Sequence, residues 1–348
     1  MVKAETTRKH HSLRDQVIQV EATHPGLGRT AVAVTVAALA GRFVFCIAPA
    51  GCGKSTISNA VGQVQPNIRF DSVTRAGLAR RAEELSGYRG ALLIDDVGRV
   101  ETEYILQNML VTLVELAYGH SINKDSGLFN FEITEFRGGV VANVQPTILR
   151  KLVKMDQWES NLSDKSLRFY HLARPVTPSM MPISLDVALD VPPDEVTFQE
   201  QDGADWRELL SIGLKQWGRT RVKEHLGTML RVMASLDGRS AVENIDLKAL
   251  AWLLKPMSLE RTILQRGGFE ADRTVNLELL HLLSAFVTYG AVTVDTIVSD
   301  YKLGISTVYE IFERQSKWAR IVRKNPTTWK PSDLAVQVMK ECGYSVPK

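Results

Sequence analysis

The sequence predicts an α/β protein with a mostly parallel sheet. Short apolar runs alternate with segments long enough for helices, which is typical of βαβ units. A glycine-rich loop directly follows the first run, and two acidic residues follow the third. The expected strands are Phe43–Ala48, Ile68–Phe70, Ala91–Ile94, Gly139–Asn143 and Phe169–Ala173. An Ala/Val-rich stretch over 25–41 precedes them and is expected to form a helix.

The composition is that of a globular protein. Of the 348 residues, 45% are hydrophobic and 23% are charged, which excludes a disordered chain or a fibre. There are 42 Lys and Arg residues against 39 Asp and Glu, a net charge of +3. This small excess excludes a surface that is basic throughout, but it allows a local basic patch.

No membrane span is expected, because the most apolar run, 30–40, is shorter than the ~20 residues that a spanning helix needs. The basic N-terminal residues are not followed by the apolar segment of a secretory signal. Three cysteines, Cys46, Cys52 and Cys342, show no metal-ligand spacing. We therefore expect a cytoplasmic protein in a reducing setting.

Changes in composition divide the chain. Five prolines lie between residues 174 and 194, which indicates a linker over the surface. A helical pattern follows it, and another pattern begins near Val275. The expected parts are a flexible lead-in (1–24), an α/β core (25–174), a proline-rich linker (175–204), a helical part (205–268) and a C-terminal part (269–348).

Residues 48–55 read APAGCGKS and match the phosphate-binding pattern G-x-x-x-x-G-K-[ST], with Ala48 in place of its first glycine. Gly51 and Gly53 allow the backbone N–H groups to face a phosphate. Lys54 is expected to reach the β and γ phosphates of ATP, and Ser55 to ligate Mg²⁺. The alternative is a glycine-rich turn formed by chance. The expected nucleotide-binding residues are Ala48, Pro49, Ala50, Gly51, Cys52, Gly53, Lys54, Ser55 and Thr56.

A second element supports the first. Residues 92–96 read LLIDD, an apolar strand that ends in two acids at the carboxyl edge of the sheet. We expect Asp95 to hold Mg²⁺ through water and Asp96 to orient an attacking water. The alternative is a solvated acidic turn.

With these motifs, residues 41–261 resemble an AAA+ ATPase. GGVVANVQP, residues 138–146, is similar to the sensor 1 strand of that family, which implies that Asn143 helps to position the water near the γ phosphate. The resemblance implies an AAA+ P-loop core with a parallel sheet and a helical lid. It also implies a homo-oligomer, a hexamer-like ring or a spiral, with ATP bound between subunits.

Two arginine roles follow from the same resemblance. Residues 158–175 resemble the segment that carries an arginine finger into the neighbouring subunit, with Arg168 as the expected finger and Lys165 or Arg174 as alternatives. Residues 221–254 resemble lids of the MoxR and MCM type, which implies that Arg221, or alternatively Arg219, is the sensor 2 residue.

Two features are less usual for the family. The family usually has Asp-Glu where this chain has Asp95-Asp96, and the shorter side chain of Asp96 puts turnover in doubt but not nucleotide binding. Residues 121–136 predict a hairpin before sensor 1. This hairpin either projects toward a ring pore, with Lys124 on a substrate, or packs on the core.

The C-terminal part predicts a winged helix-turn-helix. A helix over Leu277–Tyr289 precedes a short helix capped by Thr293, a turn at Gly304, a helix capped by Ser306 and two short strands around the Asn-Pro at 325–326. Residues 301–330 hold seven basic and two acidic residues, so they carry +5 within a chain of +3. The residues expected to bind DNA are Ser306, Thr307, Tyr309, Arg314, Lys317, Arg320, Arg323, Lys324 and Lys330. The alternative is a winged helix used for protein contacts.

The resemblance to AAA+ proteins with a C-terminal winged helix implies a DNA-binding ATPase that remodels or translocates DNA, in a helicase-like role in replication or mobile-element maintenance. An ATP-gated scaffold on DNA with slow hydrolysis is the alternative that Asp96 favours. A MoxR-like chaperone, with the winged helix as an adaptor, is a third possibility.

Overall fold

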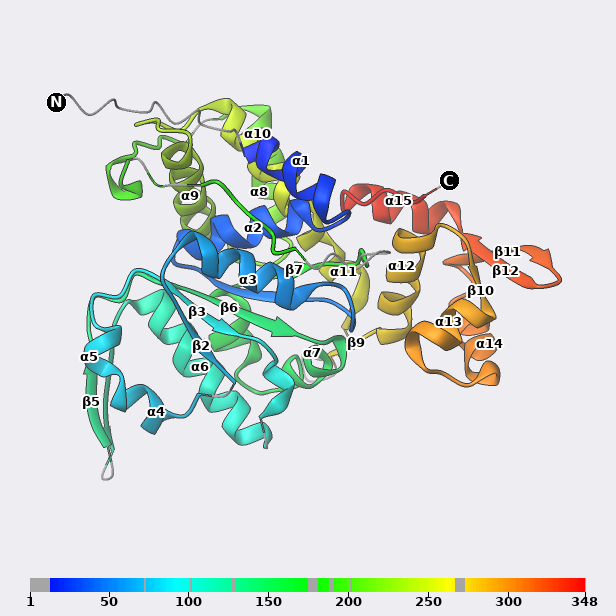
Figure 1. Ribbon diagram of the computed structural model, residues 1–348, viewed down its shortest axis with the longest axis horizontal. Coiled ribbons are helices and arrows are strands. Elements are labelled where there is room, and N and C mark those ends of the chain that lie inside the picture. Colours follow the sequence, from blue (N-terminus) through cyan, green and yellow to red (C-terminus); the bar gives the residue numbers. More distant parts are fainter. Residues whose placement is uncertain are drawn as a thin grey trace.

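A computed structural model describes residues 13–71, 73–100, 102–126, 129–174, 181–187, 189, 191–200, 202–266 and 273–347. It has a larger α/β part and a smaller C-terminal part that lies to one side of it (Figure 1).

The larger part is built on a five-stranded sheet with the order β2-β3-β6-β1-β7, in which every pairing is parallel. Its strands are β1 (Phe43–Ile47), β2 (Asn67–Phe70), β3 (Ala91–Ile94), β6 (Gly139–Val144) and β7 (Ser166–Tyr170). All residues of β1, β3, β6 and β7 are buried, as expected for parallel strands covered on both faces. The α/β class predicted from the sequence is confirmed.

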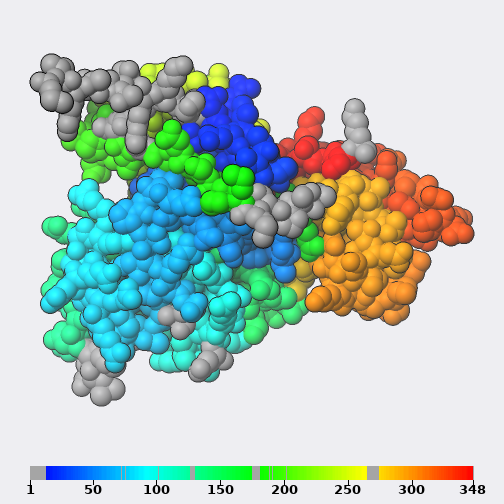
Figure 2. Space-filling view, viewed as in Figure 1, coloured from blue at the N-terminus to red at the C-terminus, as the bar shows by residue number. Residues whose placement is uncertain are grey.

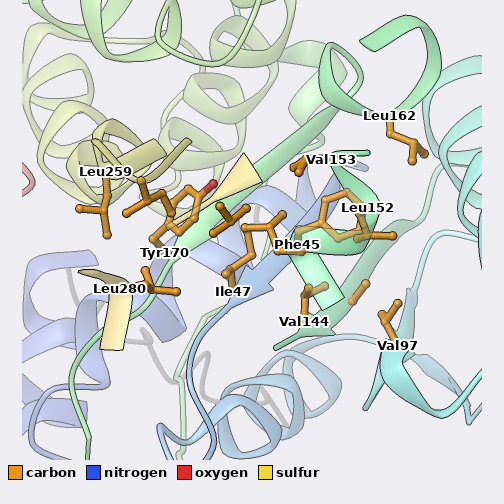
Figure 3. Close-up of a cluster of buried hydrophobic side chains, with 14 of the residues drawn as sticks. Phe45, Ile47, Val97, Val144, Leu152, Val153, Leu162, Tyr170, Leu259 and Leu280 are labelled. Atoms are coloured by element: carbon orange, nitrogen blue, oxygen red, sulfur yellow. The ribbon is translucent and has the colours of Figure 1, made fainter. Parts of the chain in front are cut away.

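One face of the sheet is covered by α6 (Glu103–Gly119) and α7 (Pro146–Leu152). Phe45, Ile47 and Val144 point to this face and pack with Leu152 in the cluster drawn in Figure 3. The same cluster continues through Tyr170 to Leu280 in the C-terminal part, so the two parts of the molecule share one core.

The other face is covered by α2 (Gly28–Leu39) and α3 (Lys54–Val64). Three further helices, α8 (Ala204–Gly213), α9 (Arg219–Leu236) and α10 (Asn244–Leu254), form an outer layer, and α9 and α10 pack on α2 (Figure 1). Because α2 lies between the sheet and this layer, most of its residues are buried. This position explains the Ala- and Val-rich sequence of α2. The helices expected to form a lid are thus part of the main core.

The described residues of the lead-in and the linker contact each other. Residues 13–23 form α1, which buries Leu13, Val17 and Val20, so the expectation of a flexible lead-in is wrong for them. Residues 1–12 lie outside the described part. In the linker, the backbone of Asp186 makes hydrogen bonds of 2.9 and 3.1 Å with the side chain of Gln16 on α1. The proline-rich segment is therefore attached to α1 at this point.

The predicted hairpin is present as β4 (Ile122–Ser126) and β5 (Phe129–Ile133). It packs against α6 and against two short helices, α4 (Arg75–Arg80) and α5 (Ala82–Leu85). Lys124 forms a 3.1 Å ion pair with Glu115 of α6. These contacts favour the interpretation that the hairpin packs on the core.

The C-terminal part joins the core through η4 (Lys255–Leu259), α11 (Glu260–Ile263) and the pair β8 (Leu264–Arg266) and β9 (Arg273–Val275). Its own helices are α12 (Leu277–Tyr289), α13 (Val294–Tyr301), α14 (Ile305–Arg314) and α15 (Asp333–Glu341). An antiparallel sheet of order β10-β12-β11 completes it, with β10 (Val292–Thr293), β11 (Ala319–Lys324) and β12 (Thr327–Pro331).

The cap residue predicted from the sequence is correct for α13 but not for α14. Thr293 caps α13 as expected, since its side chain accepts a hydrogen bond from the Thr296 N–H. Helix α14 begins at Ile305 after Gly304, so Ser306 lies in its first turn and is not the cap.

Strand β7 begins three residues before the predicted run, because it includes the polar residues Ser166 and Arg168. The Arg168 side chain is 0% exposed and donates to both carboxylate oxygens of Glu260, at 2.6 and 2.9 Å. The Tyr170 hydroxyl donates to the same carboxylate at 3.0 Å. This buried pair ties the edge strand of the sheet to α11.

Removing one partner of the pair leaves a buried charge without its counterion. We expect Glu260→Gln to lower the free energy of unfolding by about 3–5 kcal/mol, measured by urea denaturation. The double variant Arg168→Met/Glu260→Met is expected to lose less, because neither charge is then left alone. A Glu260→Gln protein within about 1 kcal/mol of the wild type would contradict this role.

Candidate functional site

The phosphate-loop motif lies between β1 and α3, at the carboxyl edge of the sheet. Gly51 and Gly53 have φ values of +76° and +78°, in the left-handed region that favours glycine. A Cβ on Gly53 would lie 2.9 Å from a Leu27 side-chain atom, whereas one on Gly51 would meet nothing within 4 Å. The loop is thus packed on one side and open on the other.

Lys54 is the first residue of α3, and its side chain reaches back across the loop. Its Nζ donates to the carbonyl oxygens of Ala48 and Pro49, at 2.8 and 2.9 Å. Burial lowers the pKa of Lys54, and the Asp96 carboxylate is among the groups that oppose this shift. Ser55 is exposed in the first turn of α3. An ammonium, a hydroxyl and a helix N-terminus at one place form a setting suited to a phosphate.

The strand order brings the second set of expected residues to the same edge. Strand β6 lies between β1 and β3, with Asn143 opposite Cys46 and Ala142 opposite Ile94. Because all three strands are parallel, Asp95 and Asp96 emerge at the edge where the phosphate loop begins.

The two acids differ in their surroundings. Asp95 forms an ion pair with Arg69 of β2, at 3.2 Å, and Arg69 also donates to Asn59 of α3 at 2.7 Å. Asp96 accepts a 2.9 Å hydrogen bond from the Gly98 N–H and so caps the short helix η1 (Val97–Arg99). Sequence reasoning did not identify Arg69, because the pairing of its strand with LLIDD is given only by the sheet order.

The described residues contain no group of three or more His, Cys, Asp or Glu side chains that could hold a metal ion. The expected ligands are one hydroxyl, from Ser55, and one carboxylate, from Asp95, which would act through water. A Mg²⁺ ion here fits the pattern in which one or two protein oxygens act with substrate phosphates and waters.

Asn143 lies beneath the loop rather than at its open side. Its side chain is buried, and its Nδ2 donates to the Ser58 hydroxyl of α3 at 2.8 Å. The Ser58 hydroxyl donates in turn to the Lys54 carbonyl at 3.3 Å. Asn143 thus braces the first turn of α3, and its contact with a phosphate stays a prediction.

The expectation that Arg168 is an arginine finger is wrong in this structure, because its side chain is fully buried on Glu260 and cannot reach another subunit. The alternatives lie at opposite ends of β7. Lys165 precedes the strand, with its Nζ 5.9 Å from the centre of the Tyr118 ring. Arg174 follows the strand and pairs with Asp300 at 2.8 Å.

Arg221 is also not brought to the phosphate loop. It lies 3.4 Å from both Asp164 and Glu224, and Glu224 contacts Arg42. Since Asp164 and Arg42 precede β7 and β1, this cluster lies at the amino edge of the sheet. The strand length of about 15 Å therefore separates it from Lys54. The expectation that Arg221 contacts the γ phosphate of the same chain is not supported. Arg219 is exposed in the first turn of the same helix.

The residues expected to bind DNA lie on α14, on the hairpin β11–β12 and, for Lys317, in the segment between them. Thr307 is half-buried, and the others are exposed: Ser306, Tyr309, Arg314, Lys317, Arg320, Arg323, Lys324 and Lys330. Arg314 is held by Glu278 at 3.0 Å and Glu310 at 3.7 Å, which makes it the least available of the basic residues. Figure 2 shows that the orange-to-red C-terminal part projects from the side of the molecule.

A groove separates α14 from the hairpin. Tyr309, Phe312 and Trp329 line it with Lys324, and the Phe312 and Trp329 rings stack with their centroids 3.9 Å apart. Sequence reasoning missed Ile321 and Val322 of β11, which are 58% and 48% exposed beside the basic residues of the hairpin.

No protein-family model matches the sequence, and no curated protein is similar enough to count as a relative. Within the described residues, no helix combines the length and apolar character needed to cross a membrane. The site must therefore be judged from its own geometry.

His171 follows β7 and lies beside the loop. Its protonation reports whether water is excluded from this region. It is buried, its Nδ1 lies 2.7 Å from the Thr30 hydroxyl, and burial lowers its pKa to about 3. Below about pH 6.5 this histidine is protonated in the unfolded chain, whereas in the folded protein it stays neutral until the pH approaches 3. The contribution of the neutral His171 to the free energy of unfolding is thus complete above pH 6.5. It is lost as the pH falls toward 3, by up to about 1.4 kcal/mol per pH unit.

We expect His171→Asn to reduce the loss of unfolding free energy between pH 6.5 and 4.5, measured by urea denaturation at several pH values. A slope equal to that of the wild type would show that His171 is protonated in the folded protein.

Proposed function

We propose that this chain is a DNA-binding ATPase of the AAA+ type, with a winged helix-turn-helix as its C-terminal part. The proposal rests on one observation: Lys54 and Ser55 lie at the same edge of the sheet as the two acids that follow β3. The proposed substrate is ATP with Mg²⁺.

The loop fits the phosphates of a nucleotide. Gly51 and Gly53 adopt conformations that turn backbone N–H groups, and the open side at Gly51 leaves room for a ligand. We propose that Lys54 contacts the β and γ phosphates. Ser55 and, through water, Asp95 would hold Mg²⁺, which supplies charge neutralisation at the phosphates. Asp96 would orient the attacking water.

A homo-oligomer is part of the proposal. Arg168 and Arg221, the two arginines expected at the γ phosphate, make ion pairs away from the loop, so neither supplies a cation there within its own chain. A second copy of the chain supplies one if the site lies between subunits of a ring or spiral. Arg219, exposed at the start of α9, is a candidate for that contact.

DNA is the proposed partner of the C-terminal part. The segment 301–330 carries seven basic and two acidic residues, and eight of the nine proposed contact residues are exposed. Most of these basic residues lie on the hairpin or just before it, because α14 itself carries one arginine and two glutamates. A basic hairpin suits contacts with DNA phosphates, and the start of α14 would offer the polar residues Ser306 and Thr307.

A second function fits one specific observation. Asp96 stands where the family usually has glutamate, and its carboxylate is already bound to the Gly98 N–H. An ATP-gated scaffold on DNA, in which ATP drives assembly and hydrolysis is slow, is therefore the alternative. ATPase rates with duplex or single-stranded DNA, beside an unwinding assay, separate the two. DNA-stimulated turnover with strand separation supports remodelling, and ATP-dependent DNA binding with negligible turnover supports the scaffold.

For the nucleotide site, we expect Lys54→Ala to lower the ATPase rate roughly a hundredfold or more, because the ammonium stabilises charge on the transferred phosphoryl group. ATP-driven assembly, followed by analytical ultracentrifugation, is expected to be lost as well. Lys248→Ala removes an exposed lysine on α10 and is the matched control. Equal rates and equal oligomers in the Lys54 variant would contradict a nucleotide-dependent function.

For the DNA site, we expect Arg323→Ala/Lys324→Ala to weaken duplex binding. If both side chains contact phosphates, the slope of log affinity against log salt falls by about 1.8. Arg207→Ala/Lys223→Ala removes the same charge from exposed positions on α8 and α9 and serves as the control. Fluorescence anisotropy across a salt series measures both. An unchanged slope in the first variant would place the hairpin away from DNA phosphates.

A further inference from the structure

The phosphate loop is in direct contact with the C-terminal part. The Cys52 Sγ, on the buried side of the loop, lies 4.0 Å from the Ser284 hydroxyl of α12. It also lies 3.9 Å from the Leu172 carbonyl oxygen, which accepts a 2.6 Å hydrogen bond from Ser284. Since all three residues are fully buried, this contact is part of the core and not of a surface.

A second set of contacts runs from the segment after β7 to α12 and α13. The Arg174 N–H donates to the Thr288 hydroxyl at 3.2 Å, and its guanidinium pairs with Asp300 at 2.8 Å. The guanidinium also lies 4.5 Å from the centre of the Tyr301 ring. The Arg174 and Asp300 side chains are only 11% and 19% exposed, so solvent screens this ion pair weakly.

These contacts connect two proposed sites by a short route. Cys52 lies between the two glycines that shape the loop, and Asp300 and Tyr301 end the helix before α14. Only the residues 302–304 separate α13 from α14, which carries Ser306, Thr307 and Tyr309. A close-packed chain of this kind transmits small displacements, because packed cores are not continuously deformable.

Phosphate binding is expected to change the hydrogen bonds within the loop. Lys54 donates to two carbonyl oxygens of the loop itself, at 2.8 and 2.9 Å. A phosphate that accepts from the same ammonium competes with these bonds and alters the loop on whose buried side Cys52 lies.

We propose that phosphate binding at the loop and DNA binding by α14 and the hairpin β11–β12 are coupled within one chain, through the Cys52–Ser284 contact and the Arg174–Asp300 ion pair. The inference rests on the proposed function and adds a regulatory link to it. Coupling between two ligands is reciprocal: each changes the affinity of the other by the same factor.

The test measures that factor in both directions. The affinity for duplex DNA is determined with and without a non-hydrolysable ATP analogue, and the affinity for the analogue with and without duplex. We expect equal factors of about fivefold or more in the wild type. In Ser284→Ala/Asp300→Asn we expect a factor below about twofold, with each ligand alone bound nearly as in the wild type.

Asp205→Asn is the control, because it weakens an ion pair with Lys248 that lies in the helical layer and connects neither site. It is expected to keep the wild-type factor. A wild-type factor of one, or an undiminished factor in the double variant, would overturn the proposed link.

A second readout does not need DNA. Amide hydrogen exchange in α12 and α13 is expected to change when the analogue is added to the wild type, to change less in the double variant and not at all in Lys54→Ala. If the analogue binds and exchange in these helices is unaltered, the link is wrong while the nucleotide site stands. If exchange changes but no DNA binds at low salt, the link to the C-terminal part stands and its proposed DNA partner is wrong.

Discussion

The position of β6 between β1 and β3 is the constraint on which the rest of the structure depends. Parallel strands end at the same edge, so this order places the phosphate loop, Asn143 and the two acids after β3 together without any long-range side-chain contact. The same order requires both faces of the sheet to be covered. The apolar residues of β1, β3 and β6 meet that requirement on one face with α6 and on the other with α2 and α3.

Much of the core was predictable because its signals are local. The run before APAGCGKS and the run that ends in Asp95-Asp96 can be recognised as strands from their own residues alone. The C-terminal helices and hairpin were likewise predictable from spacing and turn residues. Strand β7 was placed three residues late, because Arg168 makes its first half appear polar and its partner Glu260 lies 92 residues away.

The parts that could not be predicted depend on tertiary contacts. Arg168 and Arg221 have the residue type that a finger or a sensor needs, but their roles depend on which carboxylate lies nearby. Glu260 buries the first, and Asp164 with Glu224 holds the second at the amino edge of the sheet. The lead-in was predicted to be flexible because its charged residues hide the spacing of Leu13, Val17 and Val20, which is helical and buried against α2.

The Asp95–Arg69 ion pair raises the question of whether Mg²⁺ can still use the Asp95 carboxylate, and the strength of the pair answers it. A cation that uses Asp95, even through water, competes with a guanidinium at 3.2 Å. Both side chains are more than a third exposed, and exposed pairs of this kind contribute about 0–1 kcal/mol. Phosphate oxygens and a divalent charge outweigh such a pair, so Arg69 does not exclude the metal. Arg69 instead keeps the Asp95 carboxylate oriented beside the loop. The Arg174–Asp300 pair differs, because its side chains are only 11% and 19% exposed and solvent screens it less. This pair therefore holds α13 to the segment after β7 more firmly than an exposed pair would.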